Sequence, residues 1–376
     1  MSFTPKAPSS GLYLDANASE PVRPEALEAM VEGAEITGNP SSLHRAGRAA
    51  RAALDHSRRL VAERFGASAE NCVFTSGGTE ANLLAVRGLG AGRTLLVGAT
   101  EHDAIRRALD DSTLCTIPVL RDGTLDLEVL EARLSEVGQH GALVCAMLAN
   151  NETGVLHPMS EITSLCRRYG ARLHVDAVQA AGRLTFDLGS LGADSLAISG
   201  HKFGGPKGAG ALLLAGEGAV SLAPVQAGGG QERGRRGGTP ALPAIMGMAA
   251  ALDAASTRPR DLAPLRDAIE IAARAVGATV CGDGTPRLGN TTSLALSGIR
   301  SESQLIALDL DGVCVSAGSA CSSGKVATSH VLEAMGLGDL AGCAVRVSLP
   351  WNTPDDCAEI FNAAYARLVS RRRRDG

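Results

Sequence analysis

The clearest chemical signal in the sequence is a lysine in a loop of small residues. Lys202 lies in Ser199-Gly200-His201-Lys202-Phe203-Gly204-Gly205, after an apolar run that ends at Ile198 and predicts a buried strand. Glycines let a flat ligand approach the backbone, and a sequestered lysine amine deprotonates readily, as covalent catalysis through a Schiff base requires. The alternative is a surface turn with incidental lysines, because glycine is common in turns. This segment alone does not separate the two interpretations.

A second predicted strand ends in a carboxylate. Asp176 follows the apolar run Leu173–Val175 and precedes Gln179. In enzymes whose lysine binds pyridoxal 5'-phosphate (PLP), an aspartate pairs with the pyridine nitrogen and keeps it protonated, so that the ring accepts electrons. A lone aspartate at a strand end more often caps a helix. Together with Lys202, however, Asp176 favours a PLP site.

Two glycine-rich turns could bind phosphate. Ser76-Gly77-Gly78-Thr79 lies between a predicted strand and a predicted helix, where backbone N–H groups can bind an anion. The alternative there is a tight turn with Thr79 as N-cap. The second turn, Gly318–Lys325, superficially resembles a P-loop, but five residues separate Gly318 from Gly324 and Val326 replaces the required Ser or Thr. A nucleotide site is therefore rejected.

A thiol and a guanidinium complete the candidate groups. Cys321 lies in the small, polar stretch 316–324, which predicts a mobile loop from which a thiol can reach a substrate. Cys72, Cys145 and Cys314 lie in apolar runs and are expected to be buried. Arg346 lies in Ala344-Val345-Arg346-Val347-Ser348, where a buried arginine needs an anion. That anion could be a substrate α-carboxylate or a structural ion-pair partner.

The elements that must position these residues alternate between strand and helix. A helix is predicted at 45–65, and strands at 72–74, 94–97, 142–148, 173–175, 195–198, 292–296, 313–316 and 344–348. This alternation is typical of α/β architecture. A polar stretch near Thr257-Arg258-Pro259-Arg260 separates a large α/β domain, residues 15–255, from a smaller α+β domain, residues 256–376 with 1–14.

Composition limits the classes of partner. The chain has 376 residues, 45% of them hydrophobic, and a net charge of −4, which gives no basic surface for nucleic acid. No apolar stretch reaches the roughly 20 residues of a membrane span, and no signal peptide is evident at Met1–Ser10. Nine cysteines without a C-x-x-C pair predict neither disulfides nor a resident metal site. A cytoplasmic location fits best.

The segments in their order resemble a class V aminotransferase-fold cysteine desulfurase from about Tyr13 to Pro350. The matching segments are Tyr13–Asp15, Gly38–His44, Thr75–Asn82, Thr100–His102, Asn150–Gly154, His174–Gln179, Ser199–Gly210, Gly228–Thr239 and Ser319–Cys321. The resemblance implies an aspartate-aminotransferase-like PLP fold of type I, whose large domain has a mixed seven-stranded sheet.

The resemblance also implies the role of each residue. Lys202 would bind PLP covalently, Asp176 would pair with the ring nitrogen, and Gln179 would bind the phenolate oxygen. His102 would stack on the ring and take part in acid–base steps, unless it is a capping or buried histidine. The phosphate would be held by Gly78, Thr79, Ser199, His201 and, across a homodimer interface, Thr239. In one chain the segment 228–239 would be an exposed loop of a kind usually left disordered.

Substrate and partners follow from the same resemblance. Asn151, also near the cofactor, and Arg346 would bind L-cysteine, and Cys321 would take its sulfur as a persulfide and release alanine. The sulfur would pass to an acceptor protein, such as an iron–sulfur scaffold, and Cys321 could ligate a transferred cluster. The alternatives are a selenocysteine lyase, another class V PLP enzyme such as a transaminase, or a non-catalytic member; the thiol of Cys321 argues against a transaminase.

Overall fold

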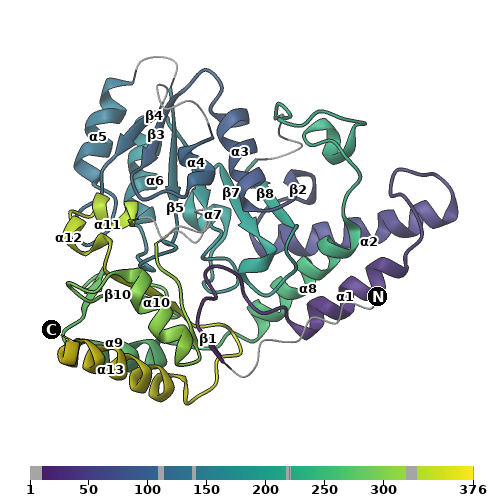
Figure 1. Cartoon of the computed structure of the whole chain (residues 1–376). Helices are drawn as coiled ribbons and strands as arrows, with labels where there is room; N and C mark the ends of the chain where they lie inside the picture. The colour runs from purple at the N-terminus through teal and green to yellow at the C-terminus, as the bar shows by residue number, and fades with distance from the viewer. Residues whose placement is uncertain are drawn as a thin grey trace. The chain divides into compact units, whose positions relative to one another are not determined.

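The computed structural model describes residues 11–108, 114–137, 141–216, 220, 222–318 and 328–375 (Figure 1). They form two compact units. The larger unit contains Ser19–Asn151 and Val155–Pro259. The smaller unit contains Glu152–Gly154 together with the described residues before Ser19 and from Arg260 onward. The chain therefore enters the smaller unit briefly in its middle, a detour that no feature of the sequence predicts.

A seven-stranded sheet forms the centre of the larger unit, in the order β2-β8-β7-β6-β5-β3-β4. The strands are β2 (Cys72–Thr75), β3 (Thr94–Gly98), β4 (Leu114–Ile117), β5 (Ala142–Met147), β6 (Arg172–Asp176), β7 (Ser195–Ser199) and β8 (Gly210–Leu214). Strand β8 is antiparallel to both neighbours, and the pairs among β3 to β7 are parallel. The mixed sheet confirms the predicted fold class.

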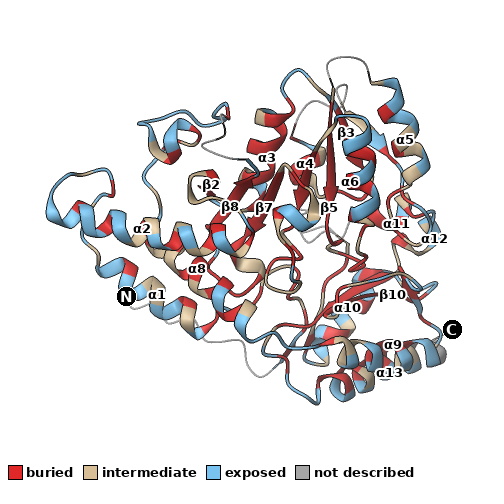
Figure 2. Cartoon of the chain, turned by 180° about the vertical axis from the view of Figure 1, so that it is seen from behind, coloured by how far each residue is buried: buried red, intermediate tan, exposed pale blue. Residues whose placement is uncertain are grey.

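Helices cover this sheet, and most residues of its strands are buried (Figure 2). The helices are α1 (Pro24–Glu35), α2 (Arg45–Arg64), α3 (Gly78–Leu89), α4 (Asp103–Arg106), α5 (Leu127–Glu136), α6 (Met159–Arg168), α7 (Leu188–Leu191) and α8 (Leu242–Thr257). Helix α3 contacts β6, β7 and β8, while α1 and α2 contact α8. Leu84 of α3, Val97 of β3 and Leu212 of β8 share one buried cluster.

The sequence analysis assigned five strands of the large sheet but neither β4 nor β8. The β8 run Gly-Ala-Leu-Leu-Leu is short, follows a glycine-rich loop and lacks alternation, so periodicity does not distinguish it from a buried helical turn. Glycine at 210 has a packing reason, because a Cβ there would lie 2.6 Å from Cα of Gly77. Strand β8 thus packs directly beneath the turn that precedes α3.

The smaller unit has its own core. Its strands are β1 (Leu12–Tyr13), β9 (Thr279–Cys281), β10 (Thr291–Ala295), β11 (Val313–Cys314) and β12 (Ala344–Ser348), and its helices are α9 (Ala263–Ala275), α10 (Ser301–Leu310), α11 (His330–Ala334), α12 (Gly338–Ala341) and α13 (Cys357–Asp375). An antiparallel sheet, β12-β10-β9, places Arg346 opposite Ser293. Helices α9 and α13 contact each other, and Ile269, Leu294, Val345 and Phe361 belong to the buried cluster.

Candidate active site

The predicted cofactor residues of the larger unit follow strands that all point the same way. Strands β3, β5, β6 and β7 are parallel, so their carboxyl ends meet at one edge of the sheet. His102 follows β3, Asn151 follows β5, Asp176 ends β6, and Lys202 follows β7. Ligands of open α/β sheets bind at this edge. The topology therefore brings together residues that are far apart in the sequence.

Asp176 is the buried anion of this edge. Its side chain is 6% exposed, and its Oδ1 accepts a hydrogen bond of 2.9 Å from the backbone N–H of Val178. Its Oδ2 accepts one of 2.7 Å from Nδ2 of Asn82. Burial raises the pKa of Asp176, and these hydrogen bonds and the charges of His102 and Lys202 oppose the increase. Asp176 thus caps the turn at Val178 rather than a helix, and the positive charges of His102 and Lys202 act on it.

Glu101 is a second buried carboxyl group beside Asp176, which the sequence analysis missed. It is 0% exposed and accepts a hydrogen bond of 2.5 Å from the backbone N–H of Met147. Burial and then the negative charge of Asp176 raise the pKa of Glu101 well above its ordinary value. Burial and the charge of Asp176 thus both favour the protonated form of Glu101.

Lys202 ends a single 3-10 turn, Gly200–Lys202, directly after β7. The turn is held by backbone hydrogen bonds from Gly200 to Ala209 O and from Gly205 to Gly200 O, both 2.9 Å. A Cβ on Gly200 would lie 3.0 Å from Met248 and 3.2 Å from two backbone oxygens, so the loop closes tightly here. Lys202 is half-buried, whereas Lys207 is exposed. The surroundings favour Lys202 over Lys207 as the covalent anchor.

His102 is half-buried and caps α4. Its Nδ1 accepts a hydrogen bond of 3.0 Å from the backbone N–H of Ala104, so the capping role considered from the sequence is present. Because Nδ1 is the acceptor, the neutral ring carries its proton on Nε2. Capping fixes the ring and does not conflict with a role beside the cofactor.

Gln179 is oriented by a half-buried arginine. Its Oε1 accepts a hydrogen bond of 2.6 Å from Nη1 of Arg183, whose Nη2 lies 3.1 Å from Glu20. The amide oxygen is thereby turned to Arg183, and the NH₂ end is the donor that suits a phenolate oxygen. Glu20 therefore supports Gln179 through Arg183.

The predicted phosphate turn leads into a helix of 12 residues, α3, with Gly77 as N-cap rather than Thr79. Gly77 has φ 157°, and a Cβ on the buried Gly78 would lie 2.7 Å from Val178 and 3.4 Å from Cβ of Ser199. Gly78 and Ser199 are thus neighbours, and Thr79 is exposed. Helix N-termini of this kind bind phosphate.

His201 lies beside the lysine at the same edge. Its Nδ1 is 3.3 Å from Oγ of Ser19. Burial, and then the positive charges of Lys202, Lys207 and Arg183, lower the pKa of His201 to about 4. The ring is therefore neutral near pH 7, and it can contribute to an anion site as a hydrogen-bond donor but not as a cation.

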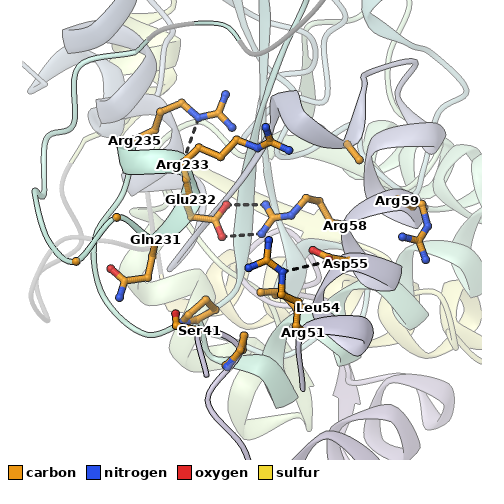
Figure 3. A pocket seen from close by; sticks show the side chains of 15 residues that line it. Ser41, Arg51, Leu54, Asp55, Arg58, Arg59, Gln231, Glu232, Arg233 and Arg235 are labelled. Carbon is orange, nitrogen blue, oxygen red and sulfur yellow. Dashed lines mark hydrogen bonds and ion pairs between the residues drawn. The ribbon is translucent and has the colours of Figure 1, made fainter. Parts of the chain in front are cut away.

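The segment 228–239 is anchored in the structure, which corrects the expectation of disorder. Both carboxylate oxygens of the buried Glu232 accept hydrogen bonds from Arg58, at 2.6 and 2.7 Å (Figure 3). Oε2 of Glu232 also accepts one from the backbone N–H of Phe74. Glu232 and Arg233 have φ of 49° and 58°, a conformation that costs energy outside glycine and needs such support. The segment borders an arginine-rich pocket of about 380 Å³, and Thr239 at its end is exposed.

A second ion pair ties this segment to the phosphate turn. Nε of Arg236 donates a hydrogen bond of 2.8 Å to Oε1 of Glu80, in the first turn of α3. Oε2 of Glu80 accepts one of 2.6 Å from the backbone N–H of Ser76. Burial raises the pKa of Glu80, but these hydrogen bonds outweigh it, and the net pKa lies below the ordinary value.

The substrate residues are described only in part. Asn151 is half-buried after β5, and Cys321 with its neighbours lies outside the described residues. In the smaller unit, Nη2 of the buried Arg346 lies 2.7 Å from Oδ1 of Asp15. The ion pair considered from the sequence therefore exists.

The three cysteines that the sequence analysis expected to be buried have raised thiol pKa values. Cys72 and Cys145 are fully buried, and burial raises the pKa of Cys72 to about 12 and that of Cys145 well above its ordinary value. Cys314 is half-buried rather than buried, and burial raises its pKa as well. A thiolate is the nucleophilic form, so these residues are poor nucleophiles near neutral pH.

Comparison with known proteins gives one family. The model of the class-V aminotransferase family matches residues 12–359. The chain is 42% identical to a cysteine desulfurase of Cereibacter sphaeroides, covering 91% of this chain and 92% of the relative. It is 35% identical to an IscS-like cysteine desulfurase of Mycobacterium tuberculosis, covering 94% and 96%.

Solved structures superpose on this chain over most of its length. A NifS-like protein from Rickettsia africae superposes with a TM-score of 0.88 at 31% identity, covering 96% of this chain and 100% of that one. A structure titled SspA in complex with cysteine superposes with a TM-score of 0.79 at 27% identity, covering 90% and 99%. The chain belongs to the class-V aminotransferase family, a family of PLP enzymes. Within that family it belongs to the cysteine desulfurases.

The residues at the sheet edge fit PLP chemically. Asp176 provides a buried anion for a pyridinium, Gln179 provides an amide donor, and Lys202 provides an amine. Gly78, where a Cβ would collide with Val178, leaves backbone N–H groups accessible at the start of α3.

In the described residues, no helix is long and apolar enough to span a membrane.

Proposed function

We propose that this protein is a PLP-dependent cysteine desulfurase that converts L-cysteine to L-alanine and keeps the sulfur as a persulfide on Cys321. The observation that carries the proposal is the buried Asp176 carboxylate, which interacts with the charges of His102 and Lys202 at one edge of the sheet. The printed names of the relatives support this activity, and the neighbour in complex with cysteine supports the substrate.

Each residue of the sheet edge has a part in holding PLP. When bound, PLP supplies an electron sink for the substrate carbon atoms. Asp176 would keep the ring nitrogen protonated, Gln179 would donate to the phenolate oxygen, and His102 would cover a ring face. The phosphate would be held by Gly78, Thr79, Ser199, His201 and the partner subunit's Thr239.

Lys202 would be both anchor and base. Lys202 is half-buried, and the neutral form of its amine is the form that bonds to a carbonyl carbon. Nζ of Lys202 would also take the proton from the α-carbon of cysteine. Arg346 would bind the α-carboxylate as a bidentate guanidinium, with Asn151 as a further polar contact.

Cys321 would take the sulfur. Its thiolate attacks the sulfur of the bound cysteine, a sulfur–sulfur bond forms, and the substrate C–S bond breaks. The electron pair of the broken bond goes to the substrate carbon, which takes up a proton as the methyl group of alanine. One thiol becomes a persulfide and one cysteine becomes one alanine, so no external oxidant is consumed.

A persulfide on Cys321 needs a partner that accepts its sulfur. A sulfur-acceptor protein would take the sulfur, an iron–sulfur scaffold being the expected acceptor, and Cys321 could also ligate a transferred cluster. The enzyme would act as a homodimer in the cytoplasm. The exposed Thr239 at the end of an anchored segment supports a contact across the dimer interface.

The test is a product assay on the purified protein with PLP and a thiol reductant. Equal amounts of alanine and sulfide from L-cysteine are expected. L-Selenocysteine is assayed in parallel, and activity confined to it would identify a selenocysteine lyase instead. Amino-group transfer to a 2-oxo acid without sulfide would overturn the proposal in favour of a transaminase.

A further inference from the structure

Behind Asp176, three buried polar side chains form a continuous line of hydrogen bonds. Oγ of Ser195 is 2.8 Å from Nδ1 of His174, Nε2 of His174 is 2.9 Å from Oδ1 of Asn82, and Nδ2 of Asn82 donates to Asp176 over 2.7 Å. Ser195 and His174 are 0% exposed and Asn82 is 1% exposed. The line connects β7, β6 and α3 and ends on the carboxylate.

Local structure explains how these side chains meet. His174 and Asp176 are two positions apart in β6, so both side chains leave the same face of the strand. Ser195 is the register partner of His174 on the neighbouring strand β7. Asn82 approaches from α3, which contacts both strands. The same helix begins at the phosphate turn.

Asp176, the acceptor at the end of the line, determines which atom donates in each hydrogen bond. A carboxylate only accepts, so the Asn82 amide must turn its NH₂ group to Asp176 and its oxygen to His174. The His174 ring must then carry its proton on Nε2 and accept from the Ser195 hydroxyl at Nδ1. Burial lowers the pKa of His174 to about 3, against a hydrogen bond with the backbone of Ser195 that raises it, so the ring is neutral near pH 7 and carries one proton. All three donors point toward Asp176.

A purely structural role explains the buried line of hydrogen bonds less well. Three polar side chains occupy a face where Ala81, Leu84 and Ala197 are otherwise packed, and apolar residues of similar size would fill this space without needing partners. A satisfied polar network orients its members uniquely. This network orients Asp176, the carboxylate that the proposed function pairs with the ring nitrogen of PLP.

We propose that Asn82 and His174 are positioning residues that fix the Asp176 carboxylate as the acceptor for the cofactor's ring nitrogen. The inference rests on the proposed PLP function. Loss of the Asn82 hydrogen bond leaves a buried carboxylate with less support, which favours its protonated form. A protonated Asp176 is a poor partner for a pyridinium, so the ring would hold its proton less firmly.

The experiment compares His174→Leu, His174→Gln and Asn82→Leu with a control, Thr163→Val. Gln restores an N–H donor near the position of Nε2, whereas Leu does not. Thr163 is a buried residue of α6 whose hydroxyl bonds to Leu191, so its loss removes a buried hydrogen bond outside the line. Three quantities are measured: the dissociation constant of PLP, the ¹⁵N chemical shift of labelled PLP, and kcat and KM for cysteine.

The Leu variants should bind PLP about 10- to 100-fold more weakly, as expected for a lost hydrogen bond to a charged group. Their ¹⁵N shift should move toward the unprotonated ring, kcat should fall with KM unchanged, and His174→Gln should lie between wild type and Leu. Leu variants that match Thr163→Val in PLP affinity and ¹⁵N shift would overturn the proposal.

The apoprotein provides a separate readout. ¹⁵N-labelled histidine in the wild-type apoprotein should show the Nε2–H tautomer of His174 with no titration between pH 5 and 8. The Nδ1–H tautomer would contradict the donor order and overturn the inference. These readouts do not need desulfuration, so a protein that binds PLP normally but leaves cysteine intact would fail the proposed function and not this inference.

Discussion

Nη2 of Arg346 and Oδ1 of Asp15 lie 2.7 Å apart, and the Arg346 side chain is 3% exposed. Both residues belong to the smaller unit, where β12 carries Arg346. The backbone of Arg346 is also held, since its N–H donates to Ser316 O over 2.6 Å. The ion pair and the proposed substrate role are compatible, because Asp15 fixes the plane of a guanidinium that must be preorganised to bind a carboxylate.

Arg346→Lys should raise KM for cysteine about 10- to 100-fold, because a point charge replaces a bidentate fork. Steady-state kinetics with PLP saturating measure the effect. Arg287→Lys is the control, since Arg287 belongs to the same unit, has a side chain that is 7% exposed, and bonds to both oxygens of Glu270 at 2.7 and 3.0 Å. It should lower thermal stability and leave KM unchanged. Equal KM values in wild type and Arg346→Lys would contradict the carboxylate role.

Lys202 should carry the cofactor. The purified protein should be yellow, borohydride should bleach the visible band, and peptide mass spectrometry should find the label on Lys202. Lys207 is the internal control because it is five positions away and exposed, whereas Lys202 is half-buried. A label on Lys207 would show that the assignment of the anchor is wrong.

Cys321→Ser should retain PLP and its visible band while losing alanine formation, because cofactor binding and sulfur removal use different groups. Cys343→Ser is the matched control, since Cys343 is a half-buried free thiol. It should keep wild-type activity. Substantial alanine production by Cys321→Ser would mean that another nucleophile, or none, takes the sulfur.

The strand ends were predictable from sequence and the contacts behind them were not. Runs of three to seven residues predicted β5, β6 and β7, and the positions of Asp176 and Lys202 just after two of these runs favoured one PLP site. The partner of His174, however, is Asn82, 92 positions away, and that of Arg236 is Glu80, 156 positions away. Pairing over such separations depends on tertiary packing and leaves no local pattern.

Glu80→Gln should test the tie between segment 228–239 and the phosphate turn. The folded-state pKa of Glu80 lies below its ordinary value of 4.5, so the ionised group stabilises the fold above the unfolded-state pKa. That contribution is lost as the pH falls through the folded-state pKa. The difference in unfolding free energy between wild type and Glu80→Gln should therefore be present at pH 7 and shrink below about pH 4.5. A difference that does not depend on pH would contradict the role of the charge.

Thr239 should reach the phosphate of the partner subunit's site in a homodimer. The residue is exposed at the end of a segment that Arg58 and Arg236 hold on the chain's own larger unit. An isologous dimer places the same segment of each chain at the other chain's surface, so two sites are completed by one interface. Thr239→Ala should weaken PLP binding, and the active protein should sediment as a dimer.

Mixed dimers decide which site Thr239 serves. In a dimer of a Lys202→Ala chain and a Thr239→Ala chain, the single intact lysine lies on the Thr239→Ala chain. If Thr239 crosses the interface, the Lys202→Ala partner supplies an intact threonine to that site, and PLP affinity there should equal that of wild type. The converse pair joins a wild-type chain to a chain that carries both substitutions. Its intact lysine should bind PLP as weakly as the Thr239→Ala homodimer does, because the partner now supplies alanine. The opposite pattern, or an active monomer, would mean that Thr239 acts within its own chain or not at all.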